Sequence, residues 1–174
     1  EHAVGAPALM EACPNATLLA HPKAAPHMID PTKLVRSAKQ VYGEQSFDAL
    51  YGEIGPVPAD RVRVMQDEEE VSWGDRVLNC WVTRGHANHH FSIQDSGTNS
   101  VFAGDAFGMV YPWLQDDGLL ALVSSSPTDF DAPEAHKSLQ VIRNTGVETV
   151  YLGHFGGVTE LSAISDQLAS EPEA

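Results

Sequence analysis

Three short segments of the sequence place a histidine or an aspartate beside glycine, where an expected β-strand ends. Imidazole and carboxylate groups bind Zn²⁺ or iron without help from a thiolate, and the two oxygens of one carboxylate can bridge two ions. Ligands that arrive from three separate strands are what a binuclear hydrolytic site needs. The segments are Gly85-His86-Ala87-Asn88-His89-His90, Gly104-Asp105-Ala106-Phe107-Gly108 and Leu152-Gly153-His154-Phe155-Gly156.

The order and context of these residues resemble the metallo-β-lactamase superfamily. The resemblance implies that His86 and His154 bind metal and that Asp105 is a carboxylate shared by two ions. The main motif of that superfamily is HxHxDH, and the chain opens with Glu1-His2 followed by small residues, which is similar to the last two positions of the motif. Glu1 and His2 are therefore implied as further ligands, with glutamate where aspartate is usual. We accordingly expect the HxH half of the motif, and the strands before it, to lie upstream of Glu1.

The elements expected to position these residues alternate between helices and strands. Interleaved helices and strands predict a layered α/β domain. The resemblance specifies it as a metallo-β-lactamase-like αββα sandwich that lacks its N-terminal strands, with residues 1–174 forming a single, partial domain that does not fold well alone. Apolar spacing predicts helices over 5–13, 32–42, 47–51, 133–144 and 159–168. Composition rich in β-formers predicts strands over 17–20, 62–65, 76–83, 91–95, 100–103 and 149–152. A hairpin is expected over 70–75.

Composition excludes several classes of function. Ten basic against 24 acidic residues give a net charge of −14, which repels phosphate backbones and anionic lipids. Cys13 and Cys80 are far apart, so neither a thiolate zinc cluster nor a disulfide framework is indicated, and we expect both thiols to be buried. No apolar run approaches the ~20 residues that cross a bilayer. We expect a cytoplasmic protein that binds a small-molecule substrate, not nucleic acid or membrane. The sequence leaves open whether the protein forms a homodimer.

Each candidate also has a structural interpretation. The histidine-rich loop at 86–90 is compatible with a solvated loop, Asp105 with a turn cap, and His154 with a core histidine. His89 and His90 are expected to orient ligands or to pack, and the serines at 124–126 lack a GxSxG elbow and are interpreted as a loop. The aromatic segment at 111–113 is either a packed loop or one wall of the substrate pocket. Structural or surface roles are expected for His21, His27 and His136.

Three functional hypotheses follow. The leading one is a hydrolase in which hydroxide held by two Zn²⁺ ions, or by iron, attacks an ester, thioester, lactone or phosphoester. The alternative is a diiron protein that binds or reduces O₂ or NO, because superfamily members related to flavodiiron proteins use HxExDH, whose carboxylate favours iron. A non-catalytic binding module without metal is the third.

Overall fold

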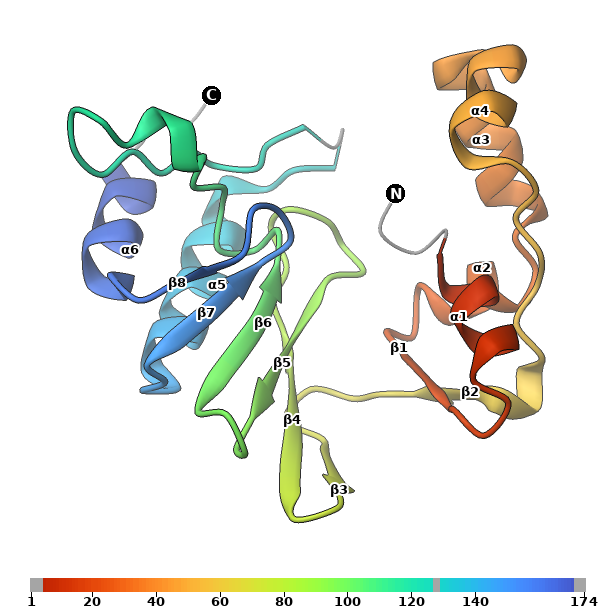
Figure 1. Cartoon of the computed structure of the whole chain (residues 1–174), viewed down its shortest axis with the longest axis horizontal. Coiled ribbons are helices and arrows are strands. Elements are labelled where there is room, and N and C mark those ends of the chain that lie inside the picture. The colour runs from red at the N-terminus through yellow and green to blue at the C-terminus, as the bar shows by residue number, and fades with distance from the viewer. Residues whose placement is uncertain (1–4, 127–128, 171–174) are drawn as a thin grey trace. The chain divides into compact units, whose positions relative to one another are not determined.

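The chain divides into two compact units, Glu1–Met65 and Gln66–Ala174. The computed structural model describes residues 5–126 and 129–170. Figure 1 shows both units, coloured from red at the start of the chain to blue at its end. The first unit contains α1 (Ala6–Ala12), β1 (Leu18–Ala20), α2 (Ala25–Ile29), α3 (Thr32–Tyr42), α4 (Glu44–Tyr51), a 3-10 turn (Ala59–Arg61) and β2 (Val62–Val64).

Two short strands of the first unit, β1 and β2, pair in parallel. Arg61 stabilises the loop after α1, because its guanidinium donates hydrogen bonds to the carbonyls of Met10 at 2.9 Å and Cys13 at 2.6 Å. Gly43 has a φ of 81°, in the left-handed region that favours glycine, and there α3 ends and α4 begins.

The second unit is built on a sheet with the strand order β3-β4-β5-β6-β7-β8. Only β6 and β7 pair in parallel, and α5 lies between them in the sequence; all other neighbours are antiparallel. The strands are β3 (Glu70–Trp73), β4 (Arg76–Val82), β5 (Phe91–Asp95), β6 (Ser100–Gly104), β7 (Thr149–Leu152) and β8 (Gly157–Val158), and the helices are a 3-10 turn (Pro112–Leu114), α5 (Ala132–Asn144) and α6 (Leu161–Ser170).

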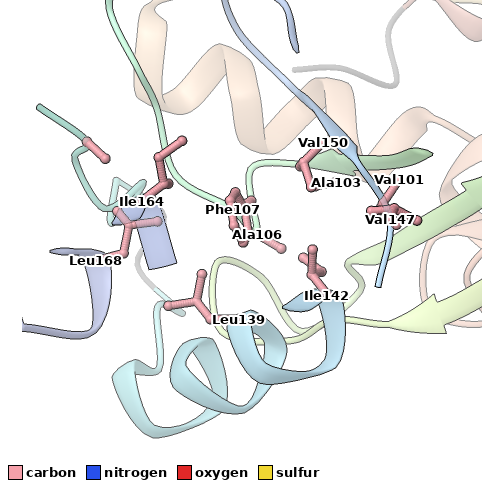
Figure 2. Packing of buried hydrophobic residues seen from close by; sticks show 11 residues of the cluster. Val101, Ala103, Ala106, Phe107, Leu139, Ile142, Val147, Val150, Ile164 and Leu168 are labelled. Carbon is pink, nitrogen blue, oxygen red and sulfur yellow. The ribbon is translucent and has the colours of Figure 1, made fainter. Parts of the chain in front are cut away.

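The core of the second unit lies between the sheet and the two helices α5 and α6. Side chains alternate along a strand, so Val101 and Val150 are fully buried in this core while Phe102 and Tyr151 point to the other face. Figure 2 shows how residues from the sheet and both helices surround Phe107, which is fully buried. From the helices come Leu139, Ile142, Ile164 and Leu168.

The mixed α/β architecture predicted from the sequence is confirmed, and most of the predicted elements are present. The bounds of α3 and β7 agree with the prediction at both ends. Two elements, α2 and β8, were not predicted from the sequence. The expectation that both thiols are buried is wrong for Cys13, which is exposed at the end of α1, while Cys80 is buried in β4. Within the described residues, no helix is long and apolar enough to cross a membrane.

Candidate metal centre

Strand direction gathers His86, Asp105 and His154 at one edge of the sheet. β4 and β6 are both antiparallel to β5, so they run in the same direction, and β7 is parallel to β6. His86 follows the end of β4, Asp105 follows β6 and His154 follows β7. The three side chains that the sequence analysis selected from separate segments therefore emerge from the same end of the sheet.

Asp105 lies between the two histidines, and each of its carboxylate oxygens faces one of them. Its Oδ2 is 3.3 Å from Nε2 of His86, and its Oδ1 is 3.4 Å from Nε2 of His154. The Asp105 side chain is only 5% exposed, against 14% for His86 and 39% for His154. A buried carboxylate that presents one oxygen to each imidazole has the arrangement of a bridging ligand.

The tautomer of His86 leaves its Nε2 free to act as a ligand when the ring is neutral. Nδ1 of His86 lies 2.8 Å from the backbone carbonyl of Ser124, which can only accept a hydrogen bond, so Nδ1 carries the proton. Metal-binding histidines are commonly oriented by such a contact on the second ring nitrogen. Sequence reasoning assigned Ser124 to a loop, which is correct, but it did not find this role for the carbonyl.

The distances between the Asp105 oxygens and the histidine Nε2 atoms agree with those between two ligand atoms of one metal ion. Two ligand atoms on a tetrahedral zinc ion, each about 2.0–2.1 Å from it, lie about 3.3–3.4 Å apart. The distances from Asp105 to His86 and His154 match this value. The separations between Asp105 and the two imidazoles are thus compatible with ligand pairs that share a metal ion.

Two histidines and one carboxylate do not complete a binuclear site. Within the part of the chain that the structure describes, no group of three or more His, Cys, Asp or Glu side chains has the geometry to hold one ion. Instead, Asp105 forms one pair with His86 and a second pair with His154. Glu1 and His2, the other expected ligands, lie outside the described residues.

His90 contacts the backbone at Asp105 through a hydrogen bond. The Asp105 N–H donates to Nε2 of His90 at 3.2 Å, so the proton of this ring is on Nδ1, which donates to Oγ1 of Thr83 at 2.9 Å. The Thr83 hydroxyl then donates to Ser92 at 2.8 Å, and Ser92 contacts the Ala103 carbonyl at 3.4 Å. This chain of hydrogen bonds joins β4, β5 and β6 beneath the candidate ligands.

Two glycines allow the close packing around the carboxylate. A Cβ at Gly153 would lie 2.8 Å from Oδ1 of Asp105, and a Cβ at Gly104 would lie 2.7 Å from Nε2 of His90. Gly104 also has a φ of 51°, which disfavours other residues. The pairing register of β6 with β7 shifts just before Asp105, as in a β-bulge, a feature that often redirects side chains at functional sites.

The loop that carries His86 is fastened to the start of α5. A Cβ at Gly85 would lie 2.3 Å from the backbone of Ala135, so only glycine allows this approach. Asn88 donates hydrogen bonds to the carboxylate of Asp129 from its backbone at 3.2 Å and from its side chain at 3.1 Å. These hydrogen bonds lower the pKa of Asp129 from its ordinary value and keep the carboxylate charged. The bond from the Asn88 backbone has the larger effect.

A pocket of about 70 Å³ adjoins the candidate centre. His86 and Asp105 form part of its wall, and α5 contributes His136, for which the sequence analysis expected a structural or surface role. Sequence reasoning missed this position because helical spacing alone does not show which partly exposed residues border a cavity. His21, in contrast, is buried in the first unit and accepts a hydrogen bond from the Lys23 backbone at 3.0 Å.

The aromatic segment after Asp105 packs beside His154 and is absent from the lining of this pocket. The ring centroids of Tyr111 and Trp113 lie 4.8 and 4.9 Å from that of Phe155, which follows His154 directly. Trp113 is 61% exposed and Phe155 is 48% exposed. Phe155 also has a φ of 67°, which is uncommon for an aromatic residue.

The chain belongs to the metallo-beta-lactamase superfamily, because the model of that family matches residues 1–154. Solved structures with the same fold include an archaeal metallo-beta-lactamase superfamily protein from Sulfolobus tokodaii, with 23% identity and a TM-score of 0.75. That alignment covers 94% of this chain and 60% of the archaeal protein, so the chain spans less than two thirds of its length.

Two further structures with this fold are described as redox or iron proteins. TTHA1623 in a di-iron-bound form is 20% identical with a TM-score of 0.63, over 96% of this chain and 70% of that protein. Rubredoxin oxygen:oxidoreductase from Desulfovibrio gigas is 15% identical with a TM-score of 0.56, over 95% of this chain and 39% of that protein. Among curated proteins, none matches the chain. These likenesses establish the fold and leave the reaction open.

Proposed function

We propose that this protein is a metal-dependent hydrolase with a binuclear centre of zinc, or alternatively iron, and that its substrate is an ester, thioester, lactone or phosphoester. The observation that carries the proposal is the position of Asp105, whose two carboxylate oxygens lie 3.3 and 3.4 Å from the Nε2 atoms of His86 and His154. Glu1 and His2 remain proposed as additional ligands.

The residues of the chain have distinct tasks in this proposal. Two bound metal ions would supply an ionised water as nucleophile and would polarise the oxygen of the bond to be cleaved. Asp105 would be a ligand shared by both ions, and the Ser124 carbonyl holds the His86 ring so that Nε2 faces Asp105. The small pocket next to His86 limits how much solvent surrounds a bound substrate.

The test is hydrolysis by zinc-loaded and iron-loaded protein across a panel of thioesters, lactones and phosphodiesters. Turnover should disappear with a chelator, return when metal is added, and require no oxygen. Activity should also rise with pH as the bound water ionises near ~7. Chelator-resistant turnover, or none with either metal, would contradict the proposal.

A diiron protein that binds or reduces O₂ or NO is the second candidate. It is supported by the similar structures of TTHA1623 in a di-iron-bound form and of rubredoxin oxygen:oxidoreductase. The two candidates differ in their response to air: a reduced iron-loaded diiron protein should change its absorbance when it meets oxygen. That change, without hydrolysis in either metal form, would favour the second candidate.

We also propose that the partner of this site is a small molecule. The net charge of −14 disfavours nucleic acids and anionic membranes. A binding assay with duplex DNA and with anionic vesicles at low salt should therefore detect no association.

A further inference from the structure

His154 lies in the short turn that joins β7 to β8. The pairing of the two strands continues to the Leu152 N–H, which donates to the Gly156 carbonyl at 3.0 Å and leaves residues 153–155 as the turn. In three-residue turns the last position commonly takes the left-handed conformation, which glycine suits best. Phe155 occupies this position with a φ of 67°. An aromatic residue therefore stands where the backbone favours glycine, directly after a candidate metal ligand.

Contacts between aromatic rings hold Phe155 in this costly conformation. A residue in a sparsely populated conformation persists only where its surroundings determine it. The Phe155 ring lies 4.8 Å from Tyr111 and 4.9 Å from Trp113, and the rings of Tyr111 and Trp113 are 5.3 Å apart. The Trp113 and Phe155 planes meet at 80°, an edge-to-face arrangement that aromatic pairs prefer. Tyr111, Trp113 and Phe155 are called the aromatic cluster below.

The loop that supplies two of the three rings, residues 109–122, is itself held by hydrogen bonds. Its two ends pair as an antiparallel bridge. Inside the loop, the Gln115 side chain donates to the Tyr111 carbonyl at 2.8 Å and accepts from the Leu120 N–H at 2.9 Å. The Gln167 side chain of α6 accepts a further hydrogen bond from the loop backbone at 2.7 Å. The aromatic cluster therefore packs Phe155 against a fixed support.

His154 is the candidate ligand whose position depends most on its turn. Its side chain is 39% exposed, against 14% for His86, whose ring is held by a backbone carbonyl. The ring of Phe155 lies 6.0 Å from that of His154. Functional groups must be held within about 0.5 Å of their productive positions. Because the two residues are adjacent in the chain, a shift of the Phe155 backbone would move the His154 ring.

We propose that Tyr111, Trp113 and Phe155 are positioning residues, which fix the turn so that Nε2 of His154 stays beside Oδ1 of Asp105. The inference rests on the proposed hydrolase function, in which His154 is a metal ligand. The aromatic cluster takes no part in bond cleavage and acts through His154.

Metal-free protein provides the first test, by NMR relaxation of backbone amides. Trp113→Ala removes two ring contacts and leaves the turn sequence unchanged. The order parameters at Gly153 and His154 should fall from the rigid value of about 0.85 to below about 0.6. Trp113→Phe, which keeps a ring, should restore them. Trp73→Ala is the matched control, because Trp73 is 65% exposed on β3, at the opposite edge of the sheet from β8.

A double-mutant cycle provides the second test, with zinc affinity measured by competition against a chelator. In a His86→Ala background, Trp113→Ala should weaken zinc binding about tenfold, as changes in groups that orient metal ligands do. In a His154→Ala background, Trp113→Ala should change the affinity by less than twofold, because the ligand on which it acts is gone. Equal losses in both backgrounds would show a general structural effect and overturn the positioning role.

Substitutions of Phe155 separate the ring from the backbone conformation. Phe155→Gly relieves the strain but removes the ring, so the order parameter at His154 and the zinc affinity should both fall as in Trp113→Ala. Phe155→Tyr keeps the ring and should retain both. If Phe155→Gly binds zinc as tightly as the unaltered protein, the turn needs no aromatic support and the inference is wrong.

The outcomes distinguish this inference from the proposed function. Loss of order at His154 in Trp113→Ala, in a protein that hydrolyses no ester with either metal, supports the positioning role and overturns the hydrolase proposal. Metal-dependent hydrolysis with unchanged order and unchanged zinc affinity in Trp113→Ala supports the hydrolase and overturns the positioning role. A raised KM in that variant, with zinc affinity unchanged, would also overturn it and assign the Trp113 ring to substrate binding.

Discussion

Substitution of Gly153 by alanine should weaken metal binding while the fold remains intact. The added Cβ would lie 2.8 Å from Oδ1 of Asp105, whereas ordinary van der Waals contact begins at 3.4 Å, so the two atoms must separate by 3.4 − 2.8 = 0.6 Å. The backbone carbon of Gly104, 3.1 Å from the same Cβ, limits how far residue 153 can retreat. The carboxylate therefore has to move.

The size of the effect follows from this displacement. Functional groups must be held within about 0.5 Å of their productive positions, and changes around metal ligands typically reduce metal affinity 10- to 100-fold. We expect a loss in that range for Gly153→Ala. Gly153 does not have a positive φ, so alanine is allowed by the backbone and unfolding stability should change by less than about 1 kcal/mol.

The assay is competition for zinc against a chelator of known affinity, combined with denaturant unfolding. Gly55→Ala is the matched control, because Gly55 has no atom within 4 Å of its added Cβ and no positive φ. Unchanged zinc affinity in Gly153→Ala, in a variant that folds like the control, would refute the argument that the position of the Asp105 carboxylate sets metal binding.

Two other predictions concern side chains at and away from the site. His90→Phe removes the acceptor for the Asp105 N–H and should lower metal affinity at least tenfold, whereas His89→Phe, an exposed control on the same loop, should not; chelator competition distinguishes them. Burial raises the pKa of the Cys80 thiol from 9.0 to about 11, so at pH 8 it holds about a hundredth of the thiolate of an ordinary cysteine. A thiol reagent should therefore label exposed Cys13 in the folded protein and Cys80 only after unfolding, and equal labelling rates would contradict this burial.

Much of the fold could be predicted because its elements carry strong local signals. α3 lies between Pro31 and Gly43, a favourable start and stop, and its bounds match the prediction. α2 has only five residues, too few for a helical apolar pattern, and its Pro26 lies in the first turn, where proline is well tolerated. β8 has two residues, too few for a periodic pattern.

The candidate site could be predicted in part. Strand ends and neighbouring glycines indicated His86, Asp105 and His154, and the structure brings these three together. The hydrogen bond from His86 to the Ser124 carbonyl and the position of His136 in the pocket depend on which segments meet in space. No spacing rule connects residues 38 or more positions apart, so these contacts required the structure.

The most direct test of the central claim is the metal content of Asp105→Ala beside that of His86→Ala and His154→Ala, measured by elemental analysis after equilibration at limiting zinc. Because Asp105 faces both imidazoles, its removal should reduce occupancy of both sites, to below one zinc ion per chain, whereas each histidine variant should mainly lose one ion. Two zinc ions retained per chain of folded Asp105→Ala would contradict the assignment of Asp105 as the bridging ligand.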